Sequence, residues 1–267
     1  MKGVSPVGGS RRTFLALTHL PSPRMNECLR THAAFAQIDV ERAHAQHFEY
    51  RRALERAGAD VEVLEANDAH PDAVFVEDTA IVLDEVAIIA SMSEASRRDE
   101  PAAIERELRR HRSVARVALP ATLEGGDVLR VGRRLLVGRS ARTNAAGIAA
   151  LRAAASPYGY DVVEVDVRGC LHLKTACTAL PDGTLLVSPA FVPDLATLGA
   201  DVVLVDEDEP LAANVVVVGE AVVTSAAFPN TAAKIRSHAR EVHRVDLSEF
   251  AKADGSATCL SLVFAAS

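Results

Sequence analysis

Apolar stretches, polar turns and amphipathic stretches follow one another in the same order several times along this chain. Apolar residues at helical spacing predict helices at residues 40–58, 97–111, 144–155, 193–198 and 229–240. Pairs of short apolar stretches around turn residues predict hairpins that join 74–82 to 86–90, 127–131 to 134–137, 171–179 to 184–187, and 214–218 to 221–224. A further strand is expected after each helix, at 61–64, 114–119, 161–167, 202–205 and 242–245. The pattern therefore predicts an α/β fold.

The polar residues that open successive units recur at intervals of 42 to 48 residues, at Glu77, Glu124, His172, Asn214 and Cys259. A repeat of this length is typical of propellers and related arrays. The fifth hairpin is completed by residues 14–17 and 259–264, which come from opposite ends of the chain and would close the ring without a free sheet edge. We therefore expect an α/β-propeller of five ββαβ-type repeats around a pseudo-fivefold axis, with the helices outside and a central active site.

Length and charge narrow the choice of partner. The chain has 267 residues, and we expect a single catalytic domain at 14–267 preceded by a tail at 1–13. Its net charge of −7 argues against nucleic-acid binding and against a basic membrane-binding face. No apolar run approaches the roughly 20 residues of a membrane span. An acidic protein favours a small cationic substrate, although most acidic proteins are acidic for solubility alone.

The number and spacing of the cysteines indicate the cellular compartment. The four cysteines are Cys28, Cys170, Cys177 and Cys259, and none are in C-x-x-C spacing, so neither a structural zinc site nor a disulfide framework is expected. This usage is typical of a reducing, cytoplasmic compartment. Residues 10–15 resemble a twin-arginine export signal, but the apolar run that follows is too short for one.

Three residues at the starts of apolar strands suggest nucleophilic chemistry. Cys259 follows the Asp254-Gly255 turn, and a thiol there can act as a nucleophile if a nearby cation ionises it. His172 occupies the same position in its own unit, so the two could form a nucleophile and a general acid/base. Glu124, next to two glycines, could orient the imidazole. Taken singly, a buried apolar cysteine, a structural histidine and a surface carboxylate are the commoner cases.

Charged residues near the other strand starts suggest a cationic ligand. Glu77 and Asp78 lie between apolar residues, where unpaired charge is costly, and with Asp72 they could pair with a guanidinium. Strand alternation would put Glu77 and Asp78 on opposite faces unless the strand end is bent. Arg97 and Arg142 lie near the starts of helices, where a substrate carboxylate could bind, although exposed helix arginines are normally solvated.

These residues lie in motifs that resemble those of the dimethylarginine dimethylaminohydrolases, members of the guanidino-group-modifying pentein superfamily. The resemblance extends from about Phe14 to Phe264. Its motifs are residues 75–78 (FVED), 96–98 (SRR), 124–127 (EGGD), 140–144 (SARTN), 171–175 (LHLKT) and 254–259 (DGSATC). The resemblance implies the pentein fold of five ββαβ-type units, which agrees with the repeat.

The resemblance also implies a role for each candidate residue. Cys259 matches the nucleophile that attacks the guanidinium carbon, His172 the general acid/base, and Glu124 its partner. The substrate-binding residues implied are Asp72 and Asp78 for the guanidinium, with Glu77 in the same cluster, Arg97 and Arg142 for the α-carboxylate, Asp254 for the α-amino end, and Leu29 as an apolar lid residue. The family uses no metal or organic cofactor, so none is expected.

The implied reaction is hydrolysis of asymmetric dimethylarginine and monomethylarginine to citrulline and dimethylamine or methylamine, through a covalent Cys-thiouronium intermediate. The EGGD motif also occurs among arginine deiminases, so hydrolysis of unmethylated arginine or another guanidino compound is an alternative. A non-enzymatic pentein that binds partners through the ring is a third reading, and it would be expected to lack the Cys–His–Glu set. The expected partner is a small cationic amino acid, and a monomer or homodimer is expected.

Overall fold

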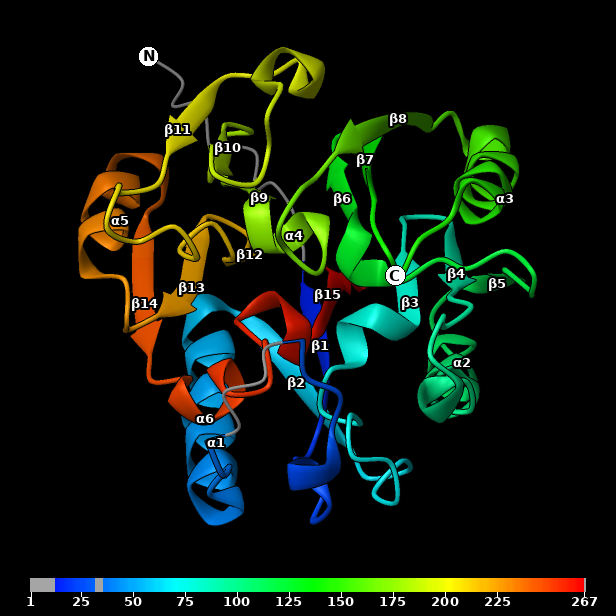
Figure 1. The fold of residues 1–267 in the computed structure, drawn as a ribbon, viewed down its shortest axis with the longest axis horizontal. Helices are drawn as coiled ribbons and strands as arrows, with labels where there is room; N and C mark the ends of the chain where they lie inside the picture. The colour runs from blue at the N-terminus through cyan, green and yellow to red at the C-terminus, as the bar shows by residue number, and fades with distance from the viewer. Residues whose placement is uncertain (1–12, 32–35, 267) are drawn as a thin grey trace, which may run out of the picture.

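The computed structural model describes residues 13–31 and 36–266, and it contains five three-stranded sheets (Figure 1). In each sheet the middle strand pairs antiparallel with one neighbour and parallel with the other. The sheets are β15-β1-β2 (Leu262–Ala265, Phe14–His19, Ala59–Leu64), β3-β4-β5 (Ala80–Val82, Val86–Ile89, Ser113–Arg116), β6-β7-β8 (Val128–Val131, Arg134–Arg139, Asp161–Asp166), β9-β10-β11 (Cys177–Ala179, Leu185–Val187, Val202–Leu204) and β12-β13-β14 (Val216–Val218, Ala221–Ser225, Glu241–Val245). The predicted order of elements in each unit is therefore confirmed.

The five sheets surround a common axis. The first strand of each predicted hairpin, namely β3, β6, β9, β12 and β15, contributes residues to one cavity of about 380 Å³. The predicted pairing of the two chain ends is confirmed, because Leu17 of β1 lies opposite Leu262 of β15 in an antiparallel ladder. The sheet that closes the ring thus combines β1 from the start of the described chain with β15 from its end.

Most helices lie outside the sheets, whereas the short helix at Leu173–Ala176 lies near the axis (Figure 1). The α-helices are α1 (Val40–Ala57), α2 (Glu100–Leu108), α3 (Ala145–Ala155), α4 (Leu173–Ala176), α5 (Pro229–Lys234) and α6 (Ser248–Ala251). Gly58 ends α1 in the left-handed conformation, as its position predicted, and Asn144 begins α3 by accepting a hydrogen bond from Gly147 N–H. Tyr50 and Leu54 of α1 share an apolar cluster with Val245 of β14, so this helix covers the junction between two units.

The predicted strands run too far at the axis end. Single helical turns stand where strand starts were expected: 3₁₀ turns at Val76–Thr79, Gly125–Asp127 and Thr258–Leu260, and helix α4 before β9. All four residues of Val76–Thr79 are buried, whereas a strand would send every second side chain to the opposite face. The bend that the Glu77–Asp78 pair required is therefore present as a helical turn.

Three predicted helices are shorter than expected. The helix predicted at 97–111 is α2 alone, the one at 193–198 is a 3₁₀ turn at Leu195–Leu198, and the one at 229–240 is α5 followed by a 3₁₀ turn at Ile235–His238. Within the described ranges, no helix is both long and apolar enough to cross a bilayer. The predicted tail at 1–13 lies outside the described residues apart from Thr13, so the proposed domain boundary stays a prediction.

Candidate active site

A small cavity lies where the helical turns meet at one end of the axis. Its volume is about 30 Å³, and its lining includes both Cys259 and His172. Eight further residues were predicted to belong to the active site. Seven of them also line this cavity, namely Leu29, Asp72, Glu77, Asp78, Arg97, Arg142 and Asp254. Glu124 stands behind it, hydrogen-bonded to the His172 ring. The structure thus brings together residues separated by up to 230 positions (Leu29 to Cys259).

Carboxylates surround the buried imidazole of His172. Its Nε2 lies 3.0 Å from Glu124 Oε2, and its Nδ1 lies 3.7 Å from Asp78 Oδ1. Burial by itself lowers the pKa of His172, but attraction to Asp78, Asp127 and Glu124 outweighs it and raises the pKa to about 9. The ring is therefore an imidazolium at neutral pH, ready to donate a proton.

Glycine is required beside this ring. A Cβ at Gly126 would lie 2.7 Å from both Asp78 Oδ1 and His172 Nδ1. No side chain fits there without displacing the acid or the imidazole. Gly126 thus allows the backbone to approach the ring closely.

Glu124 is fully buried and held from both sides. Its Oε1 accepts hydrogen bonds from Ser93 N–H at 3.2 Å and from Ser93 Oγ at 3.1 Å. Its Oε2 faces His172. Because each oxygen has a fixed partner, the carboxylate can orient the imidazole without rotating.

Cys259 lies in the 3₁₀ turn just before β15, not in the strand itself, and it is partly exposed. Ser256 N–H donates to its Sγ at 3.4 Å. Burial, together with the negative charges of Glu77 and Asp78, raises the pKa of Cys259 to about 12. In the empty cavity this residue is a thiol, so it needs a bound cation to become a thiolate.

Glu77 and Asp78 have different partners, although they are adjacent. Glu77 accepts from Lys174 Nζ at 2.7 Å and from Thr258 Oγ1 at 2.5 Å. Asp78 Oδ2 accepts from Arg97 Nη1 at 2.7 Å, while its Oδ1 has no hydrogen-bond partner among the described residues. Burial alone would raise the pKa of Asp78, but His172 and Arg97 more than offset it and lower the pKa. Asp78 is therefore an ionised carboxylate with one oxygen available in the cavity.

Asp72 and Asp254 hold the segment around the predicted lid residue. Asp72 accepts from Leu29 N–H at 3.1 Å. Asp254 Oδ2 accepts from Thr31 N–H at 2.6 Å and from its hydroxyl at 2.5 Å. Asp254 adopts a left-handed φ of 57°, which is uncommon for a residue other than glycine. The structure thus gives both acids a protein partner that the sequence did not indicate.

The two arginines differ in how much of each guanidinium is free. Arg97 is buried and donates to Glu100 through Nε and Nη2, to Asp78 through Nη1, and to Phe75 O through Nη2. One N–H on Nη1 remains. Arg142 lies just before α3, and its buried Nη1 has no hydrogen-bond partner among the described residues. Its ion pairs, at 3.7 Å to Glu124 Oε1 and 3.8 Å to Glu94 Oε1, are longer than hydrogen bonds, so Arg142 is the more available cation for an anionic ligand.

Several residues around the cavity were not predicted to belong to the site. They are Ser93, Glu100, Asp127, Lys174, Asn214 and Thr258. Asn214 and Lys174 had a signal in the sequence, because the repeat places Asn214 at a unit start and Lys174 lies in the His172 motif. Ser93 and Glu100 had none, since their partners are fixed only by tertiary contacts.

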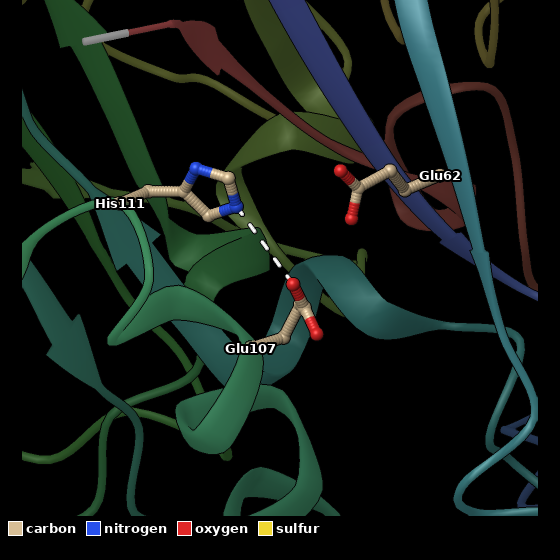
Figure 2. A group of neighbouring side chains, drawn as sticks. All are labelled: Glu62, Glu107 and His111. Carbon is tan, nitrogen blue, oxygen red and sulfur yellow. Dashed lines mark ion pairs between the residues drawn. The ribbon is translucent and has the colours of Figure 1, made fainter.

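Two groups of described residues offer three metal-ligand atoms within 4.8 Å of one another. One is Asp78, Glu124 and His172 in the cavity, and the other is Glu62, Glu107 and His111 on β2 and around the end of α2 (Figure 2). In the second group Arg110 Nη1 lies 3.8 Å from Glu62 Oε2 and pairs more closely with Glu107. Arg97 pairs with Asp78 in the first group. Arginine already compensates the carboxylate charge in each, so we assign neither group to a metal.

Comparison with known proteins identifies relatives over nearly the whole chain. A family profile described as N,N dimethylarginine dimethylhydrolase, eukaryotic, matches residues 22–263. The N(G),N(G)-dimethylarginine dimethylaminohydrolase of Streptomyces coelicolor is 40% identical over 92% of this chain and 95% of its own length. The enzyme of the same name from Pseudomonas aeruginosa is 35% identical over 88% of this chain and 93% of its own length.

Solved structures agree with these relatives. The Pseudomonas aeruginosa dimethylarginine dimethylaminohydrolase, in a mutant form complexed with citrulline, superposes with a TM-score of 0.89 and 33% identity, over 95% of this chain and 99% of that one. The N-terminal domain of ArgZ, a cyanobacterial arginine dihydrolase, shares the fold with a TM-score of 0.84 at 21% identity, over 94% of this chain and 97% of that one. The predicted pentein α/β fold is confirmed, and the chain belongs to the dimethylarginine dimethylaminohydrolase family.

Proposed function

We propose that this protein hydrolyses Nω-methylated arginines to citrulline and dimethylamine or methylamine, with Cys259 as the nucleophile. The observation that carries the proposal is a pair of buried charged atoms at the cavity that have no hydrogen-bond partner among the described residues, the anionic Asp78 Oδ1 and the cationic Arg142 Nη1. Buried polar atoms without partners are costly, and a ligand that carries both a guanidinium and a carboxylate would satisfy both. A methylated arginine is such a ligand.

Substrate binding prepares the thiol. The guanidinium pairs with Asp78 next to Cys259, and its positive charge opposes the field of Glu77 and Asp78 that holds the thiol protonated. Arg142, with the remaining N–H of Arg97, binds the α-carboxylate. Asp72 faces the guanidinium together with Asp78, Asp254 binds the α-amino end, and Leu29 acts as the apolar lid residue. Because His172 is already protonated, the proton of Cys259 leaves to solvent when the cation binds.

The first half of the reaction breaks the C–N bond. The thiolate of Cys259 attacks the guanidinium carbon, and the C=N electron pair moves onto nitrogen, which gives a tetrahedral adduct. His172 then donates its proton to the alkylated nitrogen, because an amine anion cannot leave. The C–N bond breaks, dimethylamine or methylamine departs neutral, and an S-linked thiouronium remains on Cys259.

The second half regenerates the enzyme. The imidazole of His172 is now neutral, and it takes a proton from water while the oxygen attacks the thiouronium carbon. The C–S bond then breaks with its electron pair on sulfur, the leaving thiolate takes the proton of the new hydroxyl group, and citrulline is released with the thiol restored. Glu124 and Asp78 stabilise the imidazolium that reforms.

A product assay tests the proposal. The protein is incubated with asymmetric dimethylarginine and, separately, with arginine, and citrulline and the released amine are measured. We expect dimethylamine from the first and little ammonia from the second. Equal or faster turnover of arginine would instead favour the deiminase reading, which the EGGD motif keeps as the alternative.

Variants of the two central residues test the roles. Cys259→Ser is expected to abolish turnover, and His172→Ala to prevent the reaction or trap the covalent adduct, which mass spectrometry of the intact protein detects. Cys170→Ser is the matched control, because Cys170 also lies near His172 and donates only to its carbonyl oxygen, as serine can. Full activity in either of the first two variants contradicts the mechanism.

The proposal also covers the cellular location and the oligomeric state of the protein. A cytoplasmic location is supported by the four free cysteines, which persist reduced in that compartment. Cell fractionation tests it. A monomer or homodimer is proposed for the assembly, and light scattering of the purified protein measures its mass.

A further inference from the structure

The fourth unit contributes no nucleophile, acid or base to the cavity, yet the residue at its start is buried at the centre of the site. Asn214 is 3% exposed and lies just before β12. It lines the same cavity as Cys259 and His172. In the repeat it occupies the position that His172 and Cys259 hold in their own units. A buried amide at this position needs a partner for every polar atom.

Those partners belong to two different segments. Asn214 Nδ2 donates to Lys174 O at 3.0 Å and to Thr258 Oγ1 at 2.9 Å. Asn214 Oδ1 accepts from Thr258 N–H at 2.8 Å. Lys174 lies two residues after His172, and Thr258 immediately precedes Cys259. One side-chain amide therefore joins the segment of the imidazole to the segment of the thiol.

Glu77 joins the same two segments a second time. Its carboxylate accepts from Lys174 Nζ at 2.7 Å and from Thr258 Oγ1 at 2.5 Å. Thr258 Oγ1 thus accepts from Asn214 while it donates to Glu77. Asn214, Lys174, Glu77 and Thr258 thus form a ring of hydrogen bonds, in which Asn214 binds the Lys174 backbone carbonyl and Glu77 binds the Lys174 side chain.

We propose that Asn214 is a positioning residue that fixes the separation of the Cys259 thiol and the His172 ring, a role that rests on the proposed function. The thiol must reach the guanidinium carbon while the imidazolium reaches the leaving nitrogen of the same group. An error of about 1 Å in such an arrangement can cost about 100-fold in rate. The hydrogen bonds of the Asn214 side chain go to Lys174 and Thr258, and none goes to Asp78 or Arg142 among the described residues, so we expect it to act on the chemical step and not on substrate affinity.

Three variants separate positioning from folding. Asn214→Ala removes all three hydrogen bonds, and Asn214→Asp keeps the acceptor for Thr258 N–H but loses the donor to Lys174 O. Thr178→Ala is the matched control. Thr178 Oγ1 donates to Ala213 O at 2.6 Å and accepts from Val215 N–H at 3.4 Å, so it holds the same backbone from the opposite side without touching Lys174 or Thr258.

Two readouts are measured at a temperature where circular dichroism shows each variant folded. The first is kcat and KM for asymmetric dimethylarginine. The second is the rate at which iodoacetamide labels Cys259, followed by peptide mass spectrometry, with the buried Cys28 and Cys177 as internal reference. For both Asn214 variants we expect kcat to fall about 10- to 100-fold with KM changed less than about threefold. For the uncharged Asn214→Ala we also expect Cys259 to be labelled faster, whereas the added carboxylate of Asn214→Asp opposes ionisation of the thiol.

The Thr178→Ala control shows whether a loss of kcat comes from lost positioning or from lower stability. Thr178→Ala is expected to keep kcat within about twofold of the wild type and to label Cys259 at the wild-type rate, even if it lowers Tm. An Asn214→Ala variant with wild-type kcat and labelling overturns the proposal, and so does an equal loss of kcat in Thr178→Ala. If the wild-type protein releases no dimethylamine, the proposed function fails, and the labelling rate alone then decides. Faster labelling of Cys259 in Asn214→Ala but not in Thr178→Ala supports positioning, and equal labelling rates in the two variants overturn it.

Discussion

Asp127→Asn tests whether carboxylates cause the high pKa of His172. Asp127 is fully buried, accepts from Leu173 N–H at 3.0 Å and from Ser140 Oγ at 2.5 Å, and does not line the cavity. Asparagine keeps the acceptor for Leu173 and can donate to the Ser140 hydroxyl. The substitution therefore removes one negative charge from the surroundings of His172 with little change in shape.

The expected magnitude follows from the charges around the ring. Burial lowers the pKa of His172, and Asp78, Asp127 and Glu124 together raise it from 6.5 to about 9. One nearby carboxylate changes a pKa by about 1 to 3 units, so losing Asp127 is expected to lower the pKa of His172 by at least about one unit, to about 8. The alkaline limb of kcat/KM should move by the same amount, because only the protonated ring can donate to the leaving amine.

The free energy of unfolding should also depend on the pKa of His172. The folded-state pKa lies above the unfolded value of 6.5, so the stabilising contribution is fully present below pH 6.5 and is lost as pH rises through about 9. At about 1.4 kcal/mol per pKa unit this contribution is roughly 3 kcal/mol in the wild type, and it is expected to be smaller in Asp127→Asn.

NMR of histidine-labelled protein measures the pKa directly, with His172→Ala assigning the resonance among nine histidines. Asp182→Asn is the control, because it removes a carboxylate 2.7 Å from His238 and leaves the cavity unchanged. A His172 pKa in Asp127→Asn that equals or exceeds the wild-type value would refute the electrostatic explanation.

Two further predictions concern binding and stability. Arg142→Ala should raise KM by about 10-fold or more with little change in kcat, because a charged hydrogen bond contributes roughly 1.5–3 kcal/mol. Arg139→Ala, at an exposed position, should leave KM unchanged. Equal KM values for the two variants in steady-state assays would contradict this prediction. His47→Leu should stabilise the protein by about 1 kcal/mol or more in urea unfolding, because His47 is fully buried with neither ring nitrogen hydrogen-bonded among the described residues. Burial, with the charge of Arg51, lowers the pKa of His47 to about 3, so the wild type loses stability as pH falls below 6.5 and the gain should grow in acid; a gain that shrinks there would contradict the explanation.

Local signals predicted most of the scaffold correctly. The helix predicted at 40–58 is α1, which ends before Gly58, because a helix cap acts within a few residues. The split hairpin of β1 and β15 was predictable because the repeat left one strand at each end of the chain. The helical turns at the strand starts were not predictable, because their polar side chains find partners on other units, as Glu77 does with Lys174 and Thr258.

The candidate site was predictable only as a set of residues. The motifs and the repeat singled out Cys259, His172 and Asp78, and the structure places all three at one cavity. Their electrostatic state was not visible in the sequence. Three carboxylates raise the pKa of His172, and burial, together with the charges of two acids, raises the pKa of Cys259, so the imidazole is a cation and the sulfur a thiol. Burial also strengthens charge interactions that water would weaken.

The sequence by itself determined the order of the units, their turns and the residue types that open them, since these depend on spacing and backbone preference along a few residues. Tertiary structure alone decided that Arg97 pairs with Glu100 and Asp78, that Asp254 binds Thr31, and that Asn214 joins two distant segments. The physical reason is that a buried polar side chain must be satisfied by whichever group the folded chain brings within about 3 Å. That group can lie, as Thr31 does from Asp254, 223 residues away.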